Sequence, residues 1–199
     1  MIKTLLSLLT LITGISATVD LQGQPFSKDE SNKIVFMEVV EVDSIKKEEL
    51  FGNAAYWLAE YKKKVKNKIT SFEKDSISSK MNADFRFMVY SQSGVLTKIS
   101  GAITYSLSIE MKDNRYRYIF TDFVFHYYKQ NRNYEYVETG VKKPLEETKA
   151  SGWQKVWNNH RMTVYSKAVE EIKTLKSRIL EREPAPATAP IATLKKSDW

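Results

Sequence analysis

Two histidines, His126 and His160, are the residues of this chain best suited to acid–base or metal chemistry near neutral pH. Either could accept a proton as a general base, and together with a carboxylate they could hold a metal ion. Their separation in the sequence neither supports nor opposes a shared site. Because His126 lies in a predicted strand and His160 on the apolar seam of a predicted helix, we interpret both as structural and assign no metal and no cofactor.

Cysteine is absent, so thiolate nucleophiles, disulfides and zinc sites built on sulfur are excluded. The stretch "YSQSGV" at 90–95 places a serine near a glycine but lacks the G-x-S-x-G frame of a hydrolase nucleophile. The seven glycines are scattered singly, so no phosphate-binding loop is evident. We therefore predict a protein that is not an enzyme and has no catalytic residues. A small cell-envelope hydrolase or transferase is the alternative.

The chain has a net charge of +7, and its stretch "RYRYIFTDFVFHYYK" at 115–129 mixes cations with aromatic rings, as single-stranded nucleic-acid binders do. In a strand, however, successive side chains point to opposite faces. Tyr116 and Tyr118 then turn toward the core, and Arg115 and Arg117 turn away from it. This is ordinary amphipathicity, and we predict no nucleic-acid partner.

The elements that position these residues follow from hydrophobic periodicity. Helical spacing marks 44–65 and 152–181, and strand patterns mark 33–43, 69–77, 82–91, 102–111 and the aromatic stretch 114–130. The order β-α-β-β-β-β-α predicts an α+β fold, with a curved antiparallel sheet of about five strands and both helices on one face. The other face of the sheet would be open in the monomer.

Three details of this layout depend on local composition alone. Segment 33–43 is apolar on both faces, which favours a central or well-covered strand. Segment 92–101, which contains two glycines, is predicted as a loop or wide turn. Residues 131–151 are predicted as a loop with at most a short final strand.

A two-residue turn centred on Asp113 and Asn114 connects the last two predicted strands, since Asn and Asp tolerate positive φ. Counting outward from the turn places apolar residues opposite apolar ones and an acid opposite a base. The resulting pairs are Met111–Tyr116, Glu110–Arg117, Ile109–Tyr118 and Leu107–Phe120.

Asp122 interrupts the aromatic stretch and leaves two arrangements open. In a regular strand it would point into the core, and Phe123, Phe125 and Tyr127 would form an exposed stripe available for binding or dimerisation. A β-bulge at Thr121–Asp122 would instead reverse the phase of the strand. The three rings would then turn inward and Asp122 outward, so the side of the sheet that Phe123 occupies decides between them.

The open face is the surface that we expect to bind a partner. Near the hairpin it would present Arg86, Met88, Tyr90, Thr104, Ser106, Arg115 and Arg117. We hypothesise that this surface contacts a protein, an anionic ligand or a second copy of the chain. Its binding residues would be Arg86, Met88, Tyr90, Arg115 and Arg117. A solvated sheet face without a partner is the alternative.

Both ends of the chain differ in composition from the middle. Residues 1–17 have a positive start, an apolar run and small residues at Ser16 and Ala17, which is typical of a cleavable secretory signal. We therefore expect export to the periplasm or beyond, with no membrane-spanning segment left after cleavage. Residues 18–32 are predicted as a flexible lead-in, 33–181 as a single α+β domain, and 182–199 as a disordered tail rich in proline and alanine.

Several segments resemble a bacterial family of secreted proteins of unknown function with a TBP-like fold. They are the signal-like start, "KIVFMEVVEVDSIKKEELF", "AAYWLAEY", "ITYSLSIEMKDNRYRYIFTDF" and the final helix, and the similarity covers roughly residues 33–180. The resemblance implies the same element order. It implies no reaction, cofactor or catalytic residue, and the name of a fold does not imply a function.

Overall fold

The structure is a computed structural model that describes residues 26–64, 69–93 and 96–181. The described chain forms six strands and two helices. In chain order they are β1 (Phe36–Glu41), α1 (Lys47–Lys64), β2 (Ile69–Asp75), β3 (Lys80–Ser93), β4 (Leu96–Lys112), β5 (Arg115–Gln130), β6 (Tyr136–Pro144) and α2 (Gln154–Leu180). The predicted signal segment 1–17 and tail 182–199 lie outside the described residues.

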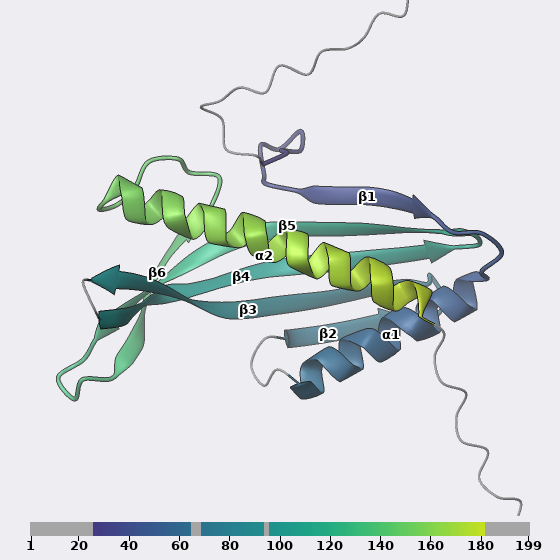
Figure 1. Ribbon diagram of the computed structural model, residues 1–199, viewed down its shortest axis with the longest axis horizontal. Coiled ribbons are helices and arrows are strands. Elements are labelled where there is room, and N and C mark those ends of the chain that lie inside the picture. Colours follow the sequence, from purple (N-terminus) through teal and green to yellow (C-terminus); the bar gives the residue numbers. More distant parts are fainter. Residues whose placement is uncertain (1–25, 65–68, 94–95, 182–199) are drawn as a thin grey trace, which may run out of the picture.

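All six strands form one antiparallel sheet, in which five follow the order β1-β5-β4-β3-β2. β6 also pairs with β5, along residues 124–130, whereas β1 pairs with residues 115–120. β1 and β6 therefore follow one another along the same side of β5. Both helices lie on one face of the sheet (Figure 1). The predicted α+β architecture is confirmed, with six strands in place of about five.

β1 is an edge strand, so the expectation that segment 33–43 is central or well covered is wrong. Its Phe36 ring packs under the helices against Phe123 and Tyr165. Its Met37 and Val39 side chains point to the opposite face and are 59% and 54% exposed. The apolar side chains of β1 therefore point alternately to a buried and to an exposed surface. Composition alone does not distinguish such a strand from one that is buried on both faces.

β3 extends to Ser93 and β4 begins at Leu96, so both strands reach into the segment 92–101 that is predicted as a loop. One extra residue on β4, Ser100, fits the two strands together as a bulge. Gly101 forms no turn: a Cβ there would lie 2.3 Å from the carbonyl oxygen of His126 and 2.5 Å from the Phe125 ring. The prediction failed because this glycine allows β4 to approach β5 closely.

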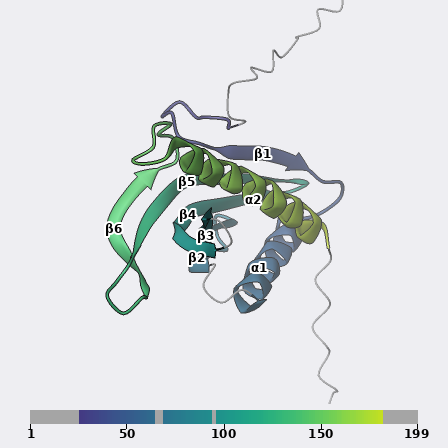
Figure 2. The same cartoon turned by 60° about the vertical axis from the view of Figure 1, so that its left-hand side comes forward.

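Residues 131–151 are also more regular than expected, because they contain the nine-residue β6. Its pairing with β5 shifts register between His126 and Tyr128, where β6 carries extra residues around Gly140. Gly140 has a φ of 80°, which is the left-handed region that glycine adopts without strain. This irregularity breaks the period-2 pattern that would have marked the segment as a strand. Figure 2 shows β6 and β5 curving together at one end of the sheet.

The predicted hairpin between β4 and β5 is confirmed with all four of its residue pairs. Asn114 adopts the expected positive φ, at 62°. The carboxylate of Asp113 accepts a hydrogen bond from the backbone N–H of Lys47 at 3.0 Å. The turn is therefore fixed to the first residue of α1.

The bulge at Thr121–Asp122 is present, and the regular-strand alternative is wrong. Ser106 pairs with Thr121 and Thr104 with Val124, which leaves Tyr105 opposite both Asp122 and Phe123. Asp122 has a φ of 56° and points outward, where its carboxylate meets the Lys33 ammonium at 2.5 Å. Beyond the bulge the chain returns its rings to the core, and no stripe containing Phe123 is exposed.

The core lies between the sheet and the helices. The Tyr105 ring stacks between Phe85, at 5.0 Å between centroids, and Phe123, at 5.4 Å. Leu50 and Leu58 of α1 and Leu175 of α2 cover this layer and are almost fully buried. Burial of an aliphatic or aromatic side chain stabilises a fold by about 1.5–3 kcal/mol, so these contacts hold both helices on the sheet.

Part of the expected flexible lead-in is a defined turn. Lys28 forms a bridge with Ile34, and the backbone N–H of Val35 donates to the carbonyl oxygen of Ser27. Phe26 packs edge-on against Phe36 of β1. Residues 26–32 therefore belong to the folded domain. Neither described helix is long and apolar enough to cross a membrane.

Candidate functional site

The open face is the surface of the sheet opposite α1 and α2, and it carries all five predicted binding residues. Arg86, Met88 and Tyr90 alternate with the buried Phe85 and Val89 on β3. Arg115 and Arg117 alternate with buried tyrosines on β5.

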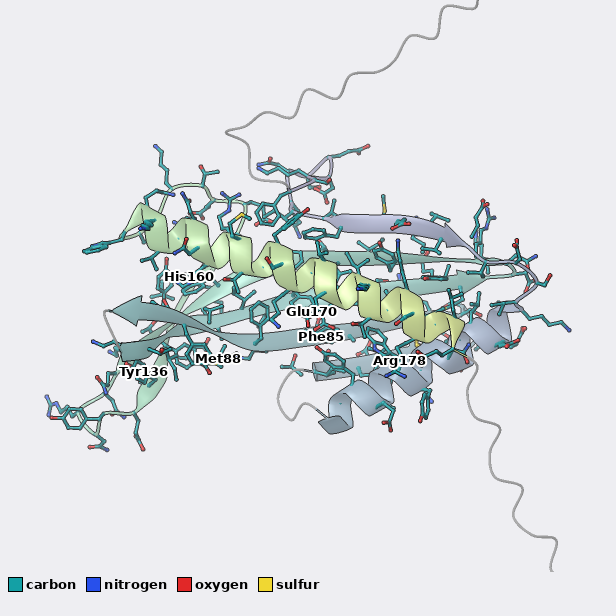
Figure 3. All side chains as sticks on the ribbon, in the orientation of Figure 1. Phe85, Met88, Tyr136, His160, Glu170 and Arg178 are labelled. Carbon is teal, nitrogen blue, oxygen red and sulfur yellow. The ribbon has the colours of Figure 1, made fainter. Side chains whose placement is uncertain are left out.

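The structure does not bring the five residues together. Arg117 pairs with Glu110, and Arg86 pairs with Thr104. Thr104 and Glu110 are six residues apart on β4, which corresponds to about 20 Å along a strand. Figure 3 shows Met88 at the end of the sheet that carries Tyr136 of β6, far from the β4–β5 hairpin. The open face thus has two separate ends.

At the β6 end, five side chains form a hydrogen-bonded group that we call the Glu138 cluster: Arg86, Thr104, His126, Tyr128 and Glu138. Glu138 accepts a hydrogen bond from Arg86 at 2.6 Å and is 2.7 Å from Nδ1 of His126. Arg86 also donates to the Tyr128 hydroxyl at 2.6 Å. The other imidazole nitrogen, Nε2, is 2.9 Å from the Thr104 hydroxyl.

The charges of the Glu138 cluster neutralise one another. The hydrogen bond from His126 and that from Arg86 lower the pKa of the Glu138 carboxyl. His126 is almost fully buried, and both of its ring nitrogens have partners. The cluster joins β6 to β3, β4 and β5, so its first role is to hold the curved end of the sheet together. A partner would have to disrupt these bonds to use Arg86.

His160 lies on the other face of the sheet, so the two histidines cannot hold one metal ion together. Its ring stacks on Phe125 at 5.0 Å between centroids, and its Nε2 is 2.8 Å from the Ser100 hydroxyl. Burial lowers the pKa of the His160 imidazole, which favours the neutral form. The structural interpretation of this residue fits these contacts.

The middle of the open face is polar, and its side chains form hydrogen bonds with one another. The carboxylate of Asp84 accepts hydrogen bonds from the hydroxyls of Ser71, at 2.6 Å, and Ser106, at 2.7 Å. Asp84 and Glu138 add acidic groups to the open face, so the face is not basic over its whole length. Glu138 was missed because it lies in a segment predicted as a loop.

The hairpin end carries a concave site that we call the hairpin hollow. It has a volume of about 250 Å³ and is lined by Val39, Glu110, Lys112, Arg115, Tyr116 and Arg117. Two of the predicted binding residues, Arg115 and Arg117, therefore line one site. Lys112 was not predicted, although its place at the end of β4 beside the turn was available from the hairpin register.

The hairpin hollow has more positive than negative charge. Glu110 pairs with Arg117 at 2.5 Å and with Lys80 at 3.4 Å, and these two cations lower the pKa of its carboxyl, Arg117 more strongly. Among the described residues, neither Lys112 nor Arg115 forms an ion pair or a side-chain hydrogen bond. The Glu41 carboxylate of β1 lies across from Arg115 in the register and offsets part of this charge.

Comparison with known proteins finds a family model that matches part of the chain and solved structures that share its fold. Residues 36–126 match the model of the family described as "Domain of unknown function (DUF4468) with TBP-like fold". A crystal structure of a TBP-like protein from Parabacteroides distasonis is 14% identical, with a TM-score of 0.55 over 78% of this chain and 97% of that one. A crystal structure of a DUF4468 family protein from Bacteroides ovatus is 13% identical, with a TM-score of 0.58 over 81% of this chain and 94% of that one.

The resemblance to a bacterial family of unknown function with a TBP-like fold is therefore confirmed over residues 36–126. None of the curated proteins matches the chain. At these identities the solved structures show the fold alone, and they assign neither ligand nor reaction.

Proposed function

We propose that this chain is an exported, non-catalytic binding module that holds an anionic group of its partner in the hairpin hollow. Export rests on the signal-like sequence of residues 1–17. The binding role is carried by one observation: Lys112 and Arg115 line a concave surface and have no acidic partner among the described side chains. The other two cations predicted for this face, Arg86 and Arg117, already have acidic partners.

The chemistry of the hollow suits a phosphate or carboxylate group. The planar guanidinium of Arg115 can donate two parallel hydrogen bonds to such a group, and Lys112 adds a point charge. Both side chains are exposed, so each contact alone contributes less than about 1 kcal/mol. Binding should therefore be of moderate strength and should weaken as salt is added.

A calorimetric titration of the full chain with pyrophosphate tests the proposal. The double variant K112S/R115S should bind pyrophosphate about tenfold more weakly than the wild type. A matched control, K155S/K173S, removes two exposed cations from α2 and should change affinity less than twofold. If both double variants weaken binding equally, the effect is one of net charge and the hollow is not the site.

A second candidate function, a small hydrolase, rests on the Glu138 cluster. Thr104, His126 and Glu138 form a hydroxyl–imidazole–carboxylate chain with distances of 2.9 and 2.7 Å, as a nucleophile, base and orienting acid do. Two features favour the structural role instead. Thr104 lies in the middle of β4, and Nη2 of Arg86 already donates to Tyr128 and Glu138.

Hydrolysis of p-nitrophenyl acetate separates the two candidates. A binding module predicts that the wild type and the variant T104V release p-nitrophenol at the same rate. A rate in the wild type at least tenfold above that of T104V would establish the hydrolase and contradict the non-catalytic proposal.

A further inference from the structure

The two most exposed aromatic side chains of the described chain lie at the β6 end. Trp153, directly before α2, is 83% exposed, and Tyr134, in the turn between β5 and β6, is 82% exposed. Figures 1 and 2 show both segments at the end of the molecule opposite the β4–β5 hairpin. Neither ring has a ring contact or a side-chain hydrogen bond among the described residues.

Trp153 occupies a position that suits other residue types. It is the N-cap of α2, and its side chain forms no hydrogen bond with the first turn of the helix. Ser, Thr, Asp and Asn carry an oxygen that accepts such a bond, whereas the indole N–H can only donate. The ring is not buried in exchange, so this tryptophan stabilises the fold in neither way.

Tyr134 also departs from local preference. Its φ of 62° lies in the left-handed region, which Gly and Asn adopt with less strain than a bulky residue. The turn holds it there, because the side-chain oxygen of Asn131 accepts hydrogen bonds from the backbone N–H groups of Asn133, at 2.8 Å, and Glu135, at 2.9 Å. Positions that depart from local rules without a compensating contact are expected at functional sites.

The β6 end also has more positive than negative charge. Two of the four carboxylates between residues 129 and 155, Glu138 and Glu147, form ion pairs. Six exposed cations of this end form none among the described residues: Lys98, Lys129, Arg132, Lys142, Lys149 and Lys155. Because they come from several strands, turns and a helix, they suit an extended anionic surface rather than a single anionic group.

We infer that the β6 end binds an anionic lipid bilayer, with the rings of Trp153 and Tyr134 at the level of the headgroups. Tryptophan and tyrosine are enriched at this depth because their rings are apolar while their N–H or O–H stays in contact with water. Each nearby cation adds attraction to anionic lipids. Rings that project singly from separate turns suit a fluid surface, since it needs no preformed pocket for either of them.

This orientation would point the hairpin hollow away from the membrane. α2 begins at the β6 end and, with its 27 residues, extends about 40 Å toward the hairpin (Figure 1). The hairpin hollow would then remain accessible to a partner in solution. The inference goes beyond the proposed function and does not depend on it.

Sedimentation with lipid vesicles tests the inference. The protein is isolated after export, without the predicted signal segment, because that apolar segment would itself enter a bilayer. The wild type should bind vesicles of phosphatidylcholine and phosphatidylglycerol about tenfold more tightly than vesicles of phosphatidylcholine alone, and added salt should reduce this difference.

The variant Y134N/W153S removes both rings and follows the local preferences from which the wild type departs. It should bind the anionic vesicles at least about tenfold more weakly than the wild type. Because serine can cap α2 and asparagine tolerates positive φ, the variant should unfold at the same urea concentration as the wild type or at a higher one.

Two control variants should bind the anionic vesicles within about threefold of the wild type. Y134F/W153F keeps an aromatic ring at both positions, and Y56S removes an exposed tyrosine from α1. Lipids brominated in their acyl chains should quench the tryptophan fluorescence of the wild type more than that of Y134F/W153F, because bound Trp153 lies at the interface.

If the wild type does not bind the anionic vesicles, or if Y134N/W153S binds them as the wild type does, the inference is wrong. If Y134N/W153S unfolds at a lower urea concentration, the two rings stabilise the fold and their exposure requires no membrane. If K112S/R115S loses vesicle binding and Y134N/W153S retains it, the lipid occupies the hairpin hollow and not the β6 end.

Discussion

Asp122 is the residue whose conformation decides which side chains reach the open face. Its φ of 56° places it in the left-handed region, where most L-residues are strained and Asp and Asn are tolerated best. The bulge that it forms turns Phe123 and Phe125 into the core. Without it, the face would present aromatic rings in place of polar side chains.

Substitution of Asp122 tests this interpretation. D122G should change the free energy of unfolding by less than about 1 kcal/mol, because glycine adopts positive φ without strain. D122V should destabilise the protein by about 1–2 kcal/mol, because a β-branched residue is poorly tolerated there. Urea denaturation measures both. Equal stability of the two variants would mean that the bulge relaxes without cost.

Glu138 should give the protein part of its sensitivity to acid. Hydrogen bonds from His126 and Arg86 lower its folded-state pKa below the usual value of 4.5. The stability that it contributes is therefore present above pH 4.5 and is lost as pH falls through the lowered pKa. E138Q should reduce the free energy of unfolding at pH 7 by about 1–2 kcal/mol, a figure discounted for its partial exposure.

The control for this prediction is E73Q, an exposed carboxylate of β2. Denaturation at pH 7 and pH 3.5 should show a smaller loss of stability in E138Q than in the wild type and E73Q. If E138Q loses as much stability between pH 7 and pH 3.5 as the wild type does, the Glu138 cluster does not stabilise the charged form of the Glu138 carboxyl.

At the scale of elements, the close approach of β4 and β5 at Gly101 organises the β6 end of the sheet. The same two strands carry Thr104 and His126 of the Glu138 cluster, so their spacing fixes the 2.9 Å contact between these side chains. A side chain at position 101 would meet the His126 carbonyl oxygen and the buried Phe125 ring, and this carbonyl cannot move without disturbing the strand pairing.

G101A should therefore destabilise the protein by at least about 2 kcal/mol, as overpacking in a core does. Gly152 supplies the matched control, because a Cβ there has no atom within 4 Å, and G152A should change stability by less than about 0.5 kcal/mol. Hydrogen exchange should show faster exchange along β5 and β6 in G101A only. If the amides of β5 and β6 exchange in G101A as slowly as in the wild type, the close approach at Gly101 does not organise this end of the sheet.

The sequence predicts the elements where their signal is local. The hairpin register and the two helices follow from side-chain alternation and turn chemistry between neighbouring residues. The same register reduces the position of Phe123 to two alternatives, of which the structure has the bulge. The errors occur where long-range pairing prevails over composition. Composition predicts a turn at Gly101 and a central position for β1, whose two faces are both apolar, and the structure contradicts both predictions. The irregular pairing of β6 around Gly140 hides the strand pattern of that segment.

At the scale of the whole molecule, the two ends of the open face differ in how their charged side chains are paired. Those of the Glu138 cluster form ion pairs with one another, whereas Lys112 and Arg115 of the hairpin hollow form none among the described residues. The sequence predicts that Arg86, Arg115 and Arg117 lie on this face but does not predict this difference, because Glu138, which pairs with Arg86, is 52 residues away in the sequence. Only the tertiary structure shows that Arg86 has an acidic partner while Arg115 and Lys112 have none among the described residues. This difference is the reason why we propose the anion site at the hairpin.

The most direct test of this claim is the pattern of backbone amide shifts when pyrophosphate is added to the labelled full chain. The account predicts that the largest changes fall on Val39 and on residues 112–117, with little change around Arg86, His126 and Glu138. The shifts should disappear in K112S/R115S. Changes centred on the Glu138 cluster, or spread evenly over the lysines of the chain, would contradict the account.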